Sequence, residues 1–238
     1  MSGKGGDTPP RGLHVPVRTA RGRSAASQRW LARQLNDPYV RAAKQAGWRS
    51  RAAFKLIELD ERFHLLRRGL RVLDLGAAPG GWTQVAAQRG ARVVGLDLLP
   101  VEKVPGAEVV QGDFEDEAVL PVLRDLLGGA ADLVLSDMAP NTTGHTATDH
   151  LRIVALAELA LDFALEILAE GGGFVAKVFQ GGSERAMMER MRRHFASVRH
   201  AKPPASRKQS SELYVVAQGF RRVPGSASGS ASGSASGG

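Results

Sequence analysis

The sequence contains no cysteine among its 238 residues. Disulfides, thiol nucleophiles and zinc sites with cysteine ligands are therefore excluded. Aromatic residues make up only 5% of the chain, and no apolar run approaches the roughly 20 residues that a membrane-spanning helix needs. The start of the chain also lacks the apolar core of a secretory signal. We therefore expect a cytoplasmic protein without membrane contact, and its 43% hydrophobic content suits one globular core.

Positive charge is abundant, with a net charge of +8, but it is unevenly placed. Residues 1–68 hold fifteen Lys or Arg against five Asp or Glu, and residues 185–222 hold ten against two. Residues 69–184 reverse the balance, with seven basic residues against seventeen acidic ones. Basic flanks suit a polyanion such as nucleic acid, and an acidic centre suits a cationic ligand. The alternative for each flank is a solvated basic face.

Composition also divides the chain into three parts. Residues 1–26 mix Gly, Pro, Ser and Arg without helical periodicity, which predicts a disordered basic arm. The arm has the composition of a mitochondrial transit peptide, but its prolines disfavour the amphipathic helix such a peptide needs. Residues 27–222 are expected to form one domain, with basic helices over 27–68 and a cofactor and catalytic core over 69–222. Residues 223–238 are rich in Gly, Ser and Ala, which predicts a disordered tail.

A glycine-rich turn stands out in the segment Val72-Leu-Asp-Leu-Gly-Ala-Ala-Pro-Gly-Gly-Trp82. It follows an apolar strand and precedes a helical segment, which is typical of a cofactor-binding turn. Gly76, Gly80 and Gly81 allow positive φ and close approach of a ligand to the backbone, and Pro79 stiffens the loop. The spacing matches neither G-x-G-x-x-G nor the P-loop. We therefore expect a ligand other than a pyrophosphate.

Three later strand-length apolar runs each end in an aspartate, at Asp97, Asp113 and Asp137. The carboxyl ends of parallel strands meet at one edge of a sheet, so these side chains, with Asp74 nearby, should share a crevice. Such a crevice suits a positively charged ligand rich in hydroxyls and amines. The alternative is that each aspartate caps a helix or begins a turn.

Hydrophobic spacing predicts strands that alternate with helices, which is typical of a doubly wound, mostly parallel α/β sheet. The last two strands have no helix between them, so one antiparallel strand is expected near the edge. The predicted helices are 28–45, 51–65, 81–89, 115–127, 149–169 and 183–195. The predicted strands are 71–75, 92–96, 108–111, 132–136, 174–179, 197–200 and 213–217.

Four motifs in this order carry a family resemblance: D-L-G-A-A-P-G-G-W, G-L-D-L-L-P, Q-G-D-F and S-D-M-A-P-N-T-T-G. Over residues 30–220 the chain resembles the S-adenosylmethionine-dependent ribose 2′-O-methyltransferases of the FtsJ/RrmJ type. The resemblance implies a Rossmann-like class I methyltransferase fold with a seven-stranded sheet. It also implies S-adenosylmethionine as cofactor, a uridine of large-subunit (23S) ribosomal RNA as target, a monomer and no metal.

The resemblance further implies roles for residues at matching positions. Gly80 and Trp82 line the methionine side of the cofactor, in the loop that includes Gly76 and Pro79. Asp97 binds the ribose hydroxyls, Asp113 the adenine amine, and Asp137 lies beside the methyl donor. The catalytic set implied by the resemblance is Lys55, Asp137, Lys177 and Glu212.

Lys177 also stands out without the resemblance, because it interrupts the apolar run Phe174-Val-Ala-Lys-Val-Phe179. A buried ammonium is costly unless it meets carboxylates or reaches solvent, and Asp137 and Glu212 would supply the carboxylates. The alternative is a lysine that protects an edge strand. The resemblance makes Lys177 the base or the residue that orients the 2′-hydroxyl, Lys55 a ligand of the substrate ribose or phosphate, and Glu212 the residue that positions the lysines.

Other functions fit less of the sequence. Methylation of a base amine is disfavoured, because no aromatic follows Asp137 to stack on an extruded base. The remaining alternatives are a 2′-O-methyltransferase of transfer or messenger RNA, a nonenzymatic ribosome-assembly factor and a dinucleotide-dependent oxidoreductase. The residues expected to grip RNA phosphates around the crevice are Arg49, Arg51, Lys55, Arg67, Arg68, Arg199, Lys202, Arg207 and Lys208.

Overall fold

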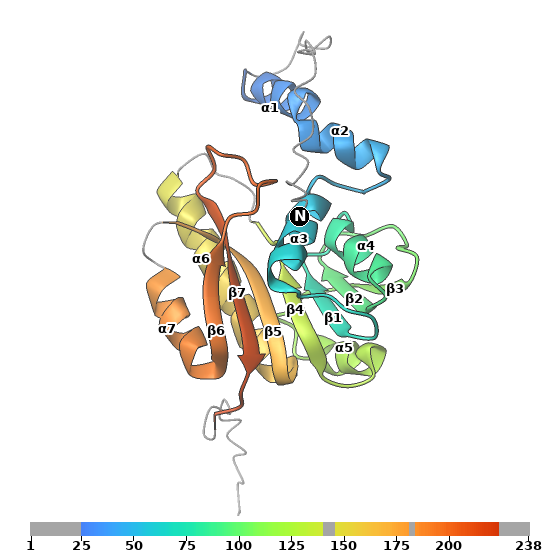
Figure 1. The fold of residues 1–238 in the computed structure, drawn as a ribbon, viewed down its shortest axis with the longest axis vertical. Helices are drawn as coiled ribbons and strands as arrows, with labels where there is room; N and C mark the ends of the chain where they lie inside the picture. The colour runs from blue at the N-terminus through green and yellow to red at the C-terminus, as the bar shows by residue number, and fades with distance from the viewer. Residues whose placement is uncertain (1–24, 140–145, 181–183, 224–238) are drawn as a thin grey trace, which may run out of the picture.

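In the computed structural model the chain forms one α/β domain, described here over residues 25–139, 146–180 and 184–223 (Figure 1). Nearly all of the predicted arm and tail, and residues 140–144 of the last motif, lie outside these residues. The strands are β1 Arg71–Leu75, β2 Arg92–Asp97, β3 Ala107–Gln111, β4 Ala131–Ser136, β5 Leu168–Phe179, β6 Phe195–Ala201 and β7 Glu212–Phe220. The helices are α1 Ala25–Asn36, α2 Pro38–Gln45, α3 Ala52–Phe63, α4 Gly81–Gln88, α5 Val119–Leu127, α6 Thr146–Ile167 and α7 Glu184–His194.

The seven strands form one sheet in the order β3-β2-β1-β4-β5-β7-β6. Neighbouring strands from β3 to β5 are parallel, and β7 lies antiparallel between β5 and β6. The doubly wound sheet and its antiparallel strand near the edge are confirmed. Because the parallel strands run the same way, their carboxyl ends share the upper edge in Figure 1.

Helices cover both faces of the sheet, which explains the continuous apolar runs in its strands. α3 and α4 pack on one face, where Leu56 and Val85 meet Val72 of β1. α5, α6 and α7 pack on the other, where Leu161 meets Leu73, the next residue of β1. Each fully buried aliphatic side chain contributes about 1.5–3 kcal/mol. Apolar cores on both faces of the sheet therefore fix the strands whose ends form the upper edge.

The N-terminal helical segment differs from its prediction. One helix was expected over residues 28–45, but the structure has two, separated at Asp37. Pro38 occupies the first turn of α2, where its missing N–H costs no helical bond, and the Asp37 carboxylate accepts a hydrogen bond from the Tyr39 N–H at 3.0 Å. Both helices lie above the upper edge of the sheet (Figure 1).

Other elements also begin or end elsewhere than expected, most clearly α5 and α6. α5 starts at Val119 instead of 115, because Asp113 and Asp116 accept turn hydrogen bonds from the main-chain N–H groups of Glu115 and Ala118, at 3.0 and 2.9 Å. α6 ends at Ile167, and the glycines at 171–173 belong to β5, whose pairing with β4 shifts register there. Among the described helices, none has the length and apolar character needed to cross a membrane.

Candidate active site

Lys177 and Asp137 meet at the upper edge of the sheet. Lys177 lies near the end of β5, and Asp137 directly follows β4, the parallel neighbour of β5. The Lys177 ammonium donates to the main-chain oxygen of Asp137 at 2.6 Å and to its carboxylate Oδ1 at 2.9 Å. The lysine side chain is only 7% exposed. It therefore has the carboxylate partner that its apolar surroundings require.

Lys55 and Glu212 complete the same cluster from distant parts of the chain. Lys55 projects from α3, and Glu212 is the first residue of β7. The Lys55 ammonium lies 2.8 Å from Glu212 Oε1 and 3.6 Å from Asp137 Oδ2. All four residues of the expected catalytic set thus meet in one buried cluster.

Tyr214 occupies the centre of this cluster, and the sequence analysis did not identify it. Its hydroxyl accepts a hydrogen bond from Lys55 Nζ at 2.8 Å and donates to Asp137 Oδ1 at 2.7 Å. Its oxygen also lies 3.3 Å from Glu212 Oε1, and its ring packs 5.6 Å from that of Trp82. The signal was available, because residues two apart on a strand share a face, so Tyr214 had to accompany Glu212.

Electrostatics fix the charge state of this cluster. Burial alone would raise the pKa of Asp137, but the ammonium groups of Lys55 and Lys177 and the hydrogen bonds from Tyr214 and Lys177 lower it below its usual value. Burial, reinforced by the carboxylates of Asp137 and Glu212, raises the pKa of Tyr214 well above its usual value. Near neutral pH Asp137 is a carboxylate and Tyr214 keeps its proton.

The glycine-rich loop between β1 and α4 lies beside this cluster and leaves no room for side chains. A Cβ at Gly76, where φ is +75°, would lie 2.3 Å from Met138 Cγ. Gly80 has φ of +104°, and a Cβ there would lie 3.0 Å from the Arg49 side chain. The turn is bonded to β2, because the N–H groups of Gly76 and Ala77 donate to the Leu96 oxygen at 2.9 and 3.1 Å. Glycine at these two positions therefore lets the Met138 and Arg49 side chains lie directly against the turn.

Trp82 and Asp74 lie deeper than expected. The Trp82 indole is 3% exposed and donates to the Ala52 oxygen at 2.8 Å, so its side chain belongs to the core and only its main chain lies at the loop. Asp74 is 1% exposed and accepts a 2.6 Å hydrogen bond from the Thr83 hydroxyl. Burial raises the pKa of Asp74 to about 7. This carboxyl supports the loop from below and does not face an open crevice.

Asp97 is the last residue of β2 and Asp113 lies two residues after β3, so both are at the same edge as Asp137. Asp97 Oδ2 accepts from the Ala78 N–H and Oδ1 from the Leu99 N–H, each at 2.8 Å. Asp113 is exposed, and its Oδ1 accepts from the Glu115 N–H at 3.0 Å. Both therefore form turns, as the structural alternative predicted, and each carboxylate keeps further lone pairs for a ligand.

The residues expected to grip RNA, apart from Lys55 in the buried cluster, divide into three groups. The groups are those bonded to other parts of the protein, those near or after the end of β6, and those that precede β1. Several bind other parts of the protein: Arg49 binds main-chain oxygens, Arg51 and Arg207 form ion pairs with Asp37 at 2.9 and 3.2 Å, and Lys202 donates to the Ser210 oxygen at 2.7 Å. Arg199 and Lys208 lie near the end of β6 and in the segment that follows it.

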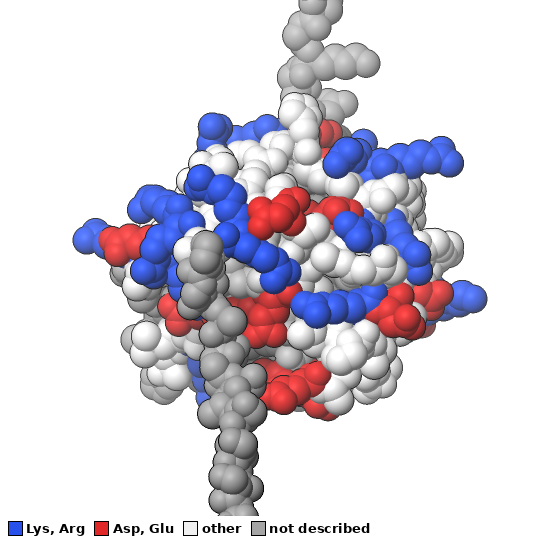
Figure 2. Space-filling model, turned by 90° about the horizontal axis from the view of Figure 1, so that it is seen from below, with Lys and Arg blue, Asp and Glu red and all other residues white. Residues whose placement is uncertain are grey.

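Arg67 and Arg68 precede β1 and lie at the opposite edge of the sheet. The prediction that they flank the crevice was therefore wrong, because a residue before a parallel strand cannot share the edge formed by the strand ends. Figure 2 shows the molecule from this lower side, where carboxylates lie among the lysines and arginines. The ion pair between Arg71 and Asp132, 2.8 Å long, is one example.

Among the residues that the structure describes, no cluster of three His, Asp or Glu side chains could hold a metal.

The chain is similar to known proteins over most of its length. The model of the family described as FtsJ-like methyltransferase matches residues 48–220. The ribosomal RNA large subunit methyltransferase E of Granulibacter bethesdensis is 70% identical over 215 residues, covering 90% of this chain and 94% of that protein. The protein of the same name from Gluconobacter oxydans is 69% identical, covering 87% and 78%.

Solved structures show the same fold. A Plasmodium falciparum protein described as a ribosomal RNA methyltransferase is 28% identical, with a TM-score of 0.66, and the match covers 73% of this chain and 98% of that one. A Lactococcus lactis protein described as a hemolysin is 22% identical, with a TM-score of 0.53, covering 72% and 88%. The latter shows a shared fold alone.

Proposed function

Since the chain belongs to the FtsJ-like methyltransferase family, we propose that it methylates the ribose 2′-hydroxyl of a uridine in large-subunit ribosomal RNA. The methyl donor is S-adenosylmethionine. The observation that carries this proposal is the buried cluster in which Lys177 contacts Asp137 at 2.9 Å beside the glycine-rich loop. Neither a nonenzymatic RNA-binding protein nor a dinucleotide-dependent oxidoreductase needs such a cluster.

The residues at the upper edge fit S-adenosylmethionine. The glycine-rich turn lies at the same edge as Asp97 and Asp113, whose carboxylates suit ribose hydroxyls and an adenine amine. The carboxylate of Asp137, kept ionised by its neighbours, suits a sulfonium. When bound, this cofactor supplies an electrophilic methyl group.

Lys177 is placed to act on the ribose hydroxyl, which must lose its proton as its oxygen gains the methyl group. An ammonium has three N–H donors, and Asp137 accepts two hydrogen bonds from Lys177, through its main-chain oxygen and Oδ1. The third position on Nζ remains for the 2′-oxygen. As an ammonium Lys177 orients that oxygen, and as a neutral amine it takes the proton.

Lys55 has a different role from the one the resemblance implied. Its ammonium is already occupied by Glu212, by the Tyr214 hydroxyl and, at 3.6 Å, by Asp137. It therefore holds the two carboxylates and the tyrosine in place instead of binding substrate ribose or phosphate. Glu212 is itself fixed by the Ser206 hydroxyl at 2.8 Å.

Assembled or assembling large subunits in the cytoplasm are the proposed substrate, and the proteins of G. bethesdensis and G. oxydans are named for that subunit. The basic N-terminal flank lies above the site through α1 and α2 (Figure 1) and adds attraction for phosphates. The monomeric state stays a prediction.

The test uses the purified full chain, labelled S-adenosylmethionine and large subunits from cells that lack the enzyme. We expect one ribose of 23S RNA to gain a 2′-O-methyl group, mapped by resistance of the adjacent bond to alkaline hydrolysis. Equilibrium binding should detect S-adenosylmethionine but not NAD. Transfer to transfer or messenger RNA alone would replace the proposed substrate, and failure to bind the cofactor would refute the enzyme class.

A further inference from the structure

Arg49 binds two loops of the cofactor edge at once. It lies in the short connection between α2 and α3. Its Nη1 donates to the Glu102 oxygen at 2.6 Å and to the Pro79 oxygen at 3.2 Å, and its Nη2 donates to the Lys103 oxygen at 2.6 Å. One guanidinium therefore joins the glycine-rich loop to the segment that follows β2.

The two joined segments border the place proposed for the cofactor. The first contains Gly76 and Gly80, and the second begins directly after Asp97. Asp97 connects them on the side of the strand ends, through its 2.8 Å hydrogen bond from the Ala78 N–H. Arg49 makes the second connection, further along both segments. Two separate connections prevent the segments from moving apart.

The Arg49 backbone is itself held in place by α4. Its N–H donates to Gln84 Oε1 at 3.1 Å, and Gln84 Nε2 donates in turn to the Gly47 oxygen at 2.9 Å. The side chain thus starts from a fixed point on the same helix that begins at the glycine-rich loop. A planar guanidinium with five N–H donors can serve three carbonyls in this geometry, whereas the ammonium of a lysine is a single point.

We propose that Arg49 is a positioning residue for the cofactor site, which clamps the loop at residues 76–81 to the segment at 98–104. This inference rests on the proposed function for the identity of the cofactor. It also replaces the expectation that Arg49 grips RNA phosphates, because both terminal nitrogens of its guanidinium already donate to protein carbonyls. Its loss loosens the binding site before any ligand arrives.

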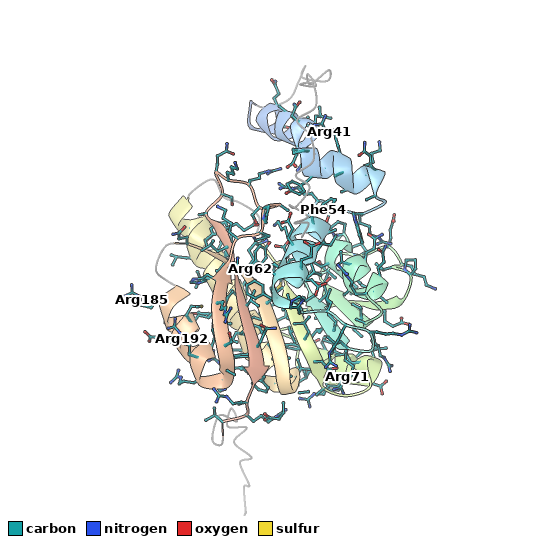
Figure 3. The ribbon with its side chains drawn as sticks, in the orientation of Figure 1. Arg41, Phe54, Arg62, Arg71, Arg185 and Arg192 are labelled. Atoms are coloured by element: carbon teal, nitrogen blue, oxygen red, sulfur yellow. The ribbon has the colours of Figure 1, made fainter. Side chains whose placement is uncertain are left out.

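The experiment compares Arg49→Ala and Arg49→Lys with Arg185→Ala. Arg185 is an exposed arginine on α7 that points away from the sheet (Figure 3), so its removal controls for the loss of one positive charge. Calorimetry measures the binding of S-adenosylmethionine and S-adenosylhomocysteine. Hydrogen exchange measures the protection of residues 98–104 without ligand.

We expect both Arg49 variants to bind the cofactor roughly tenfold more weakly, because each loses two or three hydrogen bonds at the site. Exchange in residues 98–104 should rise in both and stay unchanged in Arg185→Ala. At saturating cofactor, kcat should stay within about threefold and the KM for RNA should not move, since chemistry and substrate contacts are intact.

Wild-type cofactor affinity and wild-type exchange in Arg49→Ala would overturn the clamp. A raised KM for RNA with unchanged cofactor affinity, rescued in Arg49→Lys, would also overturn it and restore the phosphate contact. If the unaltered protein bound neither cofactor, the proposed function would fail. The exchange experiment would still decide whether Arg49 joins the two segments.

Discussion

Two groups of carboxylates share the upper edge of the sheet but differ in their bonding partners and exposure. Asp137 and Glu212 are largely buried and bonded to Lys55, Lys177 and Tyr214. Asp97 and Asp113 bond the main-chain N–H groups of neighbouring loop residues, and Asp113 is exposed. The first group is therefore organised before any ligand binds, and the second keeps its remaining acceptors for one.

The difference indicates which residues should affect turnover and which should affect ligand binding. A change in the first group alters charges that compensate one another in a buried place, so it should affect turnover most. A change in the second removes contacts to a ligand and leaves the reacting groups in place. Substitutions at Lys177, Tyr214 and Asp97 test this division.

The largest effect is expected at Lys177. Lys177→Ala should lower kcat at least ~10³-fold, because it removes the group that we propose acts on the 2′-hydroxyl. Cofactor affinity should change only a few-fold, since the carboxylates that face the ligand remain. Single-turnover methylation and calorimetry provide the two measurements.

Lys177→Arg sharpens this test, because it keeps the charge but cannot give up its proton. Substantial turnover would assign Lys177 the orienting role, and loss equal to that of alanine would assign it the base. Unaltered turnover in Lys177→Ala would break the distinction between the two groups altogether.

Tyr214→Phe should give the next largest effect, a fall in kcat of roughly 10–100-fold, equal to the loss of charged hydrogen bonds worth about 1.5–3 kcal/mol. The ring that packs against Trp82 is kept, so the fold should persist. Tyr39→Phe is the matched control, because it also deletes a hydroxyl bonded to a glutamate, Glu58 at 3.2 Å, outside the cluster. Equal losses in both variants would mean that the Tyr214 hydroxyl only supports the fold.

On the binding side, Asp97→Ala should raise the dissociation constant for S-adenosylmethionine roughly tenfold or more, because a carboxylate contact is lost. Turnover at saturating cofactor should fall only a few-fold. Asp116→Ala is the control, since Asp116 also accepts a turn hydrogen bond, from the Ala118 N–H at 2.9 Å, but lies beyond the strand ends. A loss of kcat without a loss of affinity in Asp97→Ala would contradict the division.

The smallest effect concerns Asp74, which lies beneath both groups. Its folded pKa of about 7 exceeds its ordinary value of 3.8, so the folded state holds this proton more tightly than the unfolded state does. The contribution to stability is complete below the ordinary value and is lost as pH rises toward 7. Asp74→Asn should remove this dependence, because an amide has no proton to lose in this range.

Urea unfolding of both proteins at several pH values measures the Asp74 effect. The free energy of unfolding should fall more steeply with rising pH in the unaltered protein than in the variant. Parallel curves would show that folding does not raise the pKa of Asp74.

The fold could be predicted because its signals are local. Apolar runs of strand length that end in aspartate identified β2, β3 and β4, and the missing helix before β7 indicated an antiparallel strand. The break at Pro38 was equally local, but helical spacing on both sides concealed it. Lys177 was identifiable because a charge inside an apolar run demands a partner.

The rest depends on contacts between distant segments. Tyr214 meets Lys55 across 159 positions, and Arg49 meets Lys103 across 54. Neither pairing has a spacing signature, because only the packing of α3 on the sheet and of the loops on α4 brings these atoms together. Composition likewise could not separate Arg67 and Arg68, at the lower edge, from basic residues at the upper edge.

The position of β7 has a consequence for how the protein is made. This strand is the last of the sheet to be synthesised, yet it lies between β5 and β6 and carries both Glu212 and Tyr214. A chain that stops before residue 212 has its glycine-rich loop and both lysines but lacks two of their partners. Among the described strands, β6 has no partner until β7 is made. The buried cluster around Lys55 and Lys177 can therefore be completed only after β7 has been synthesised.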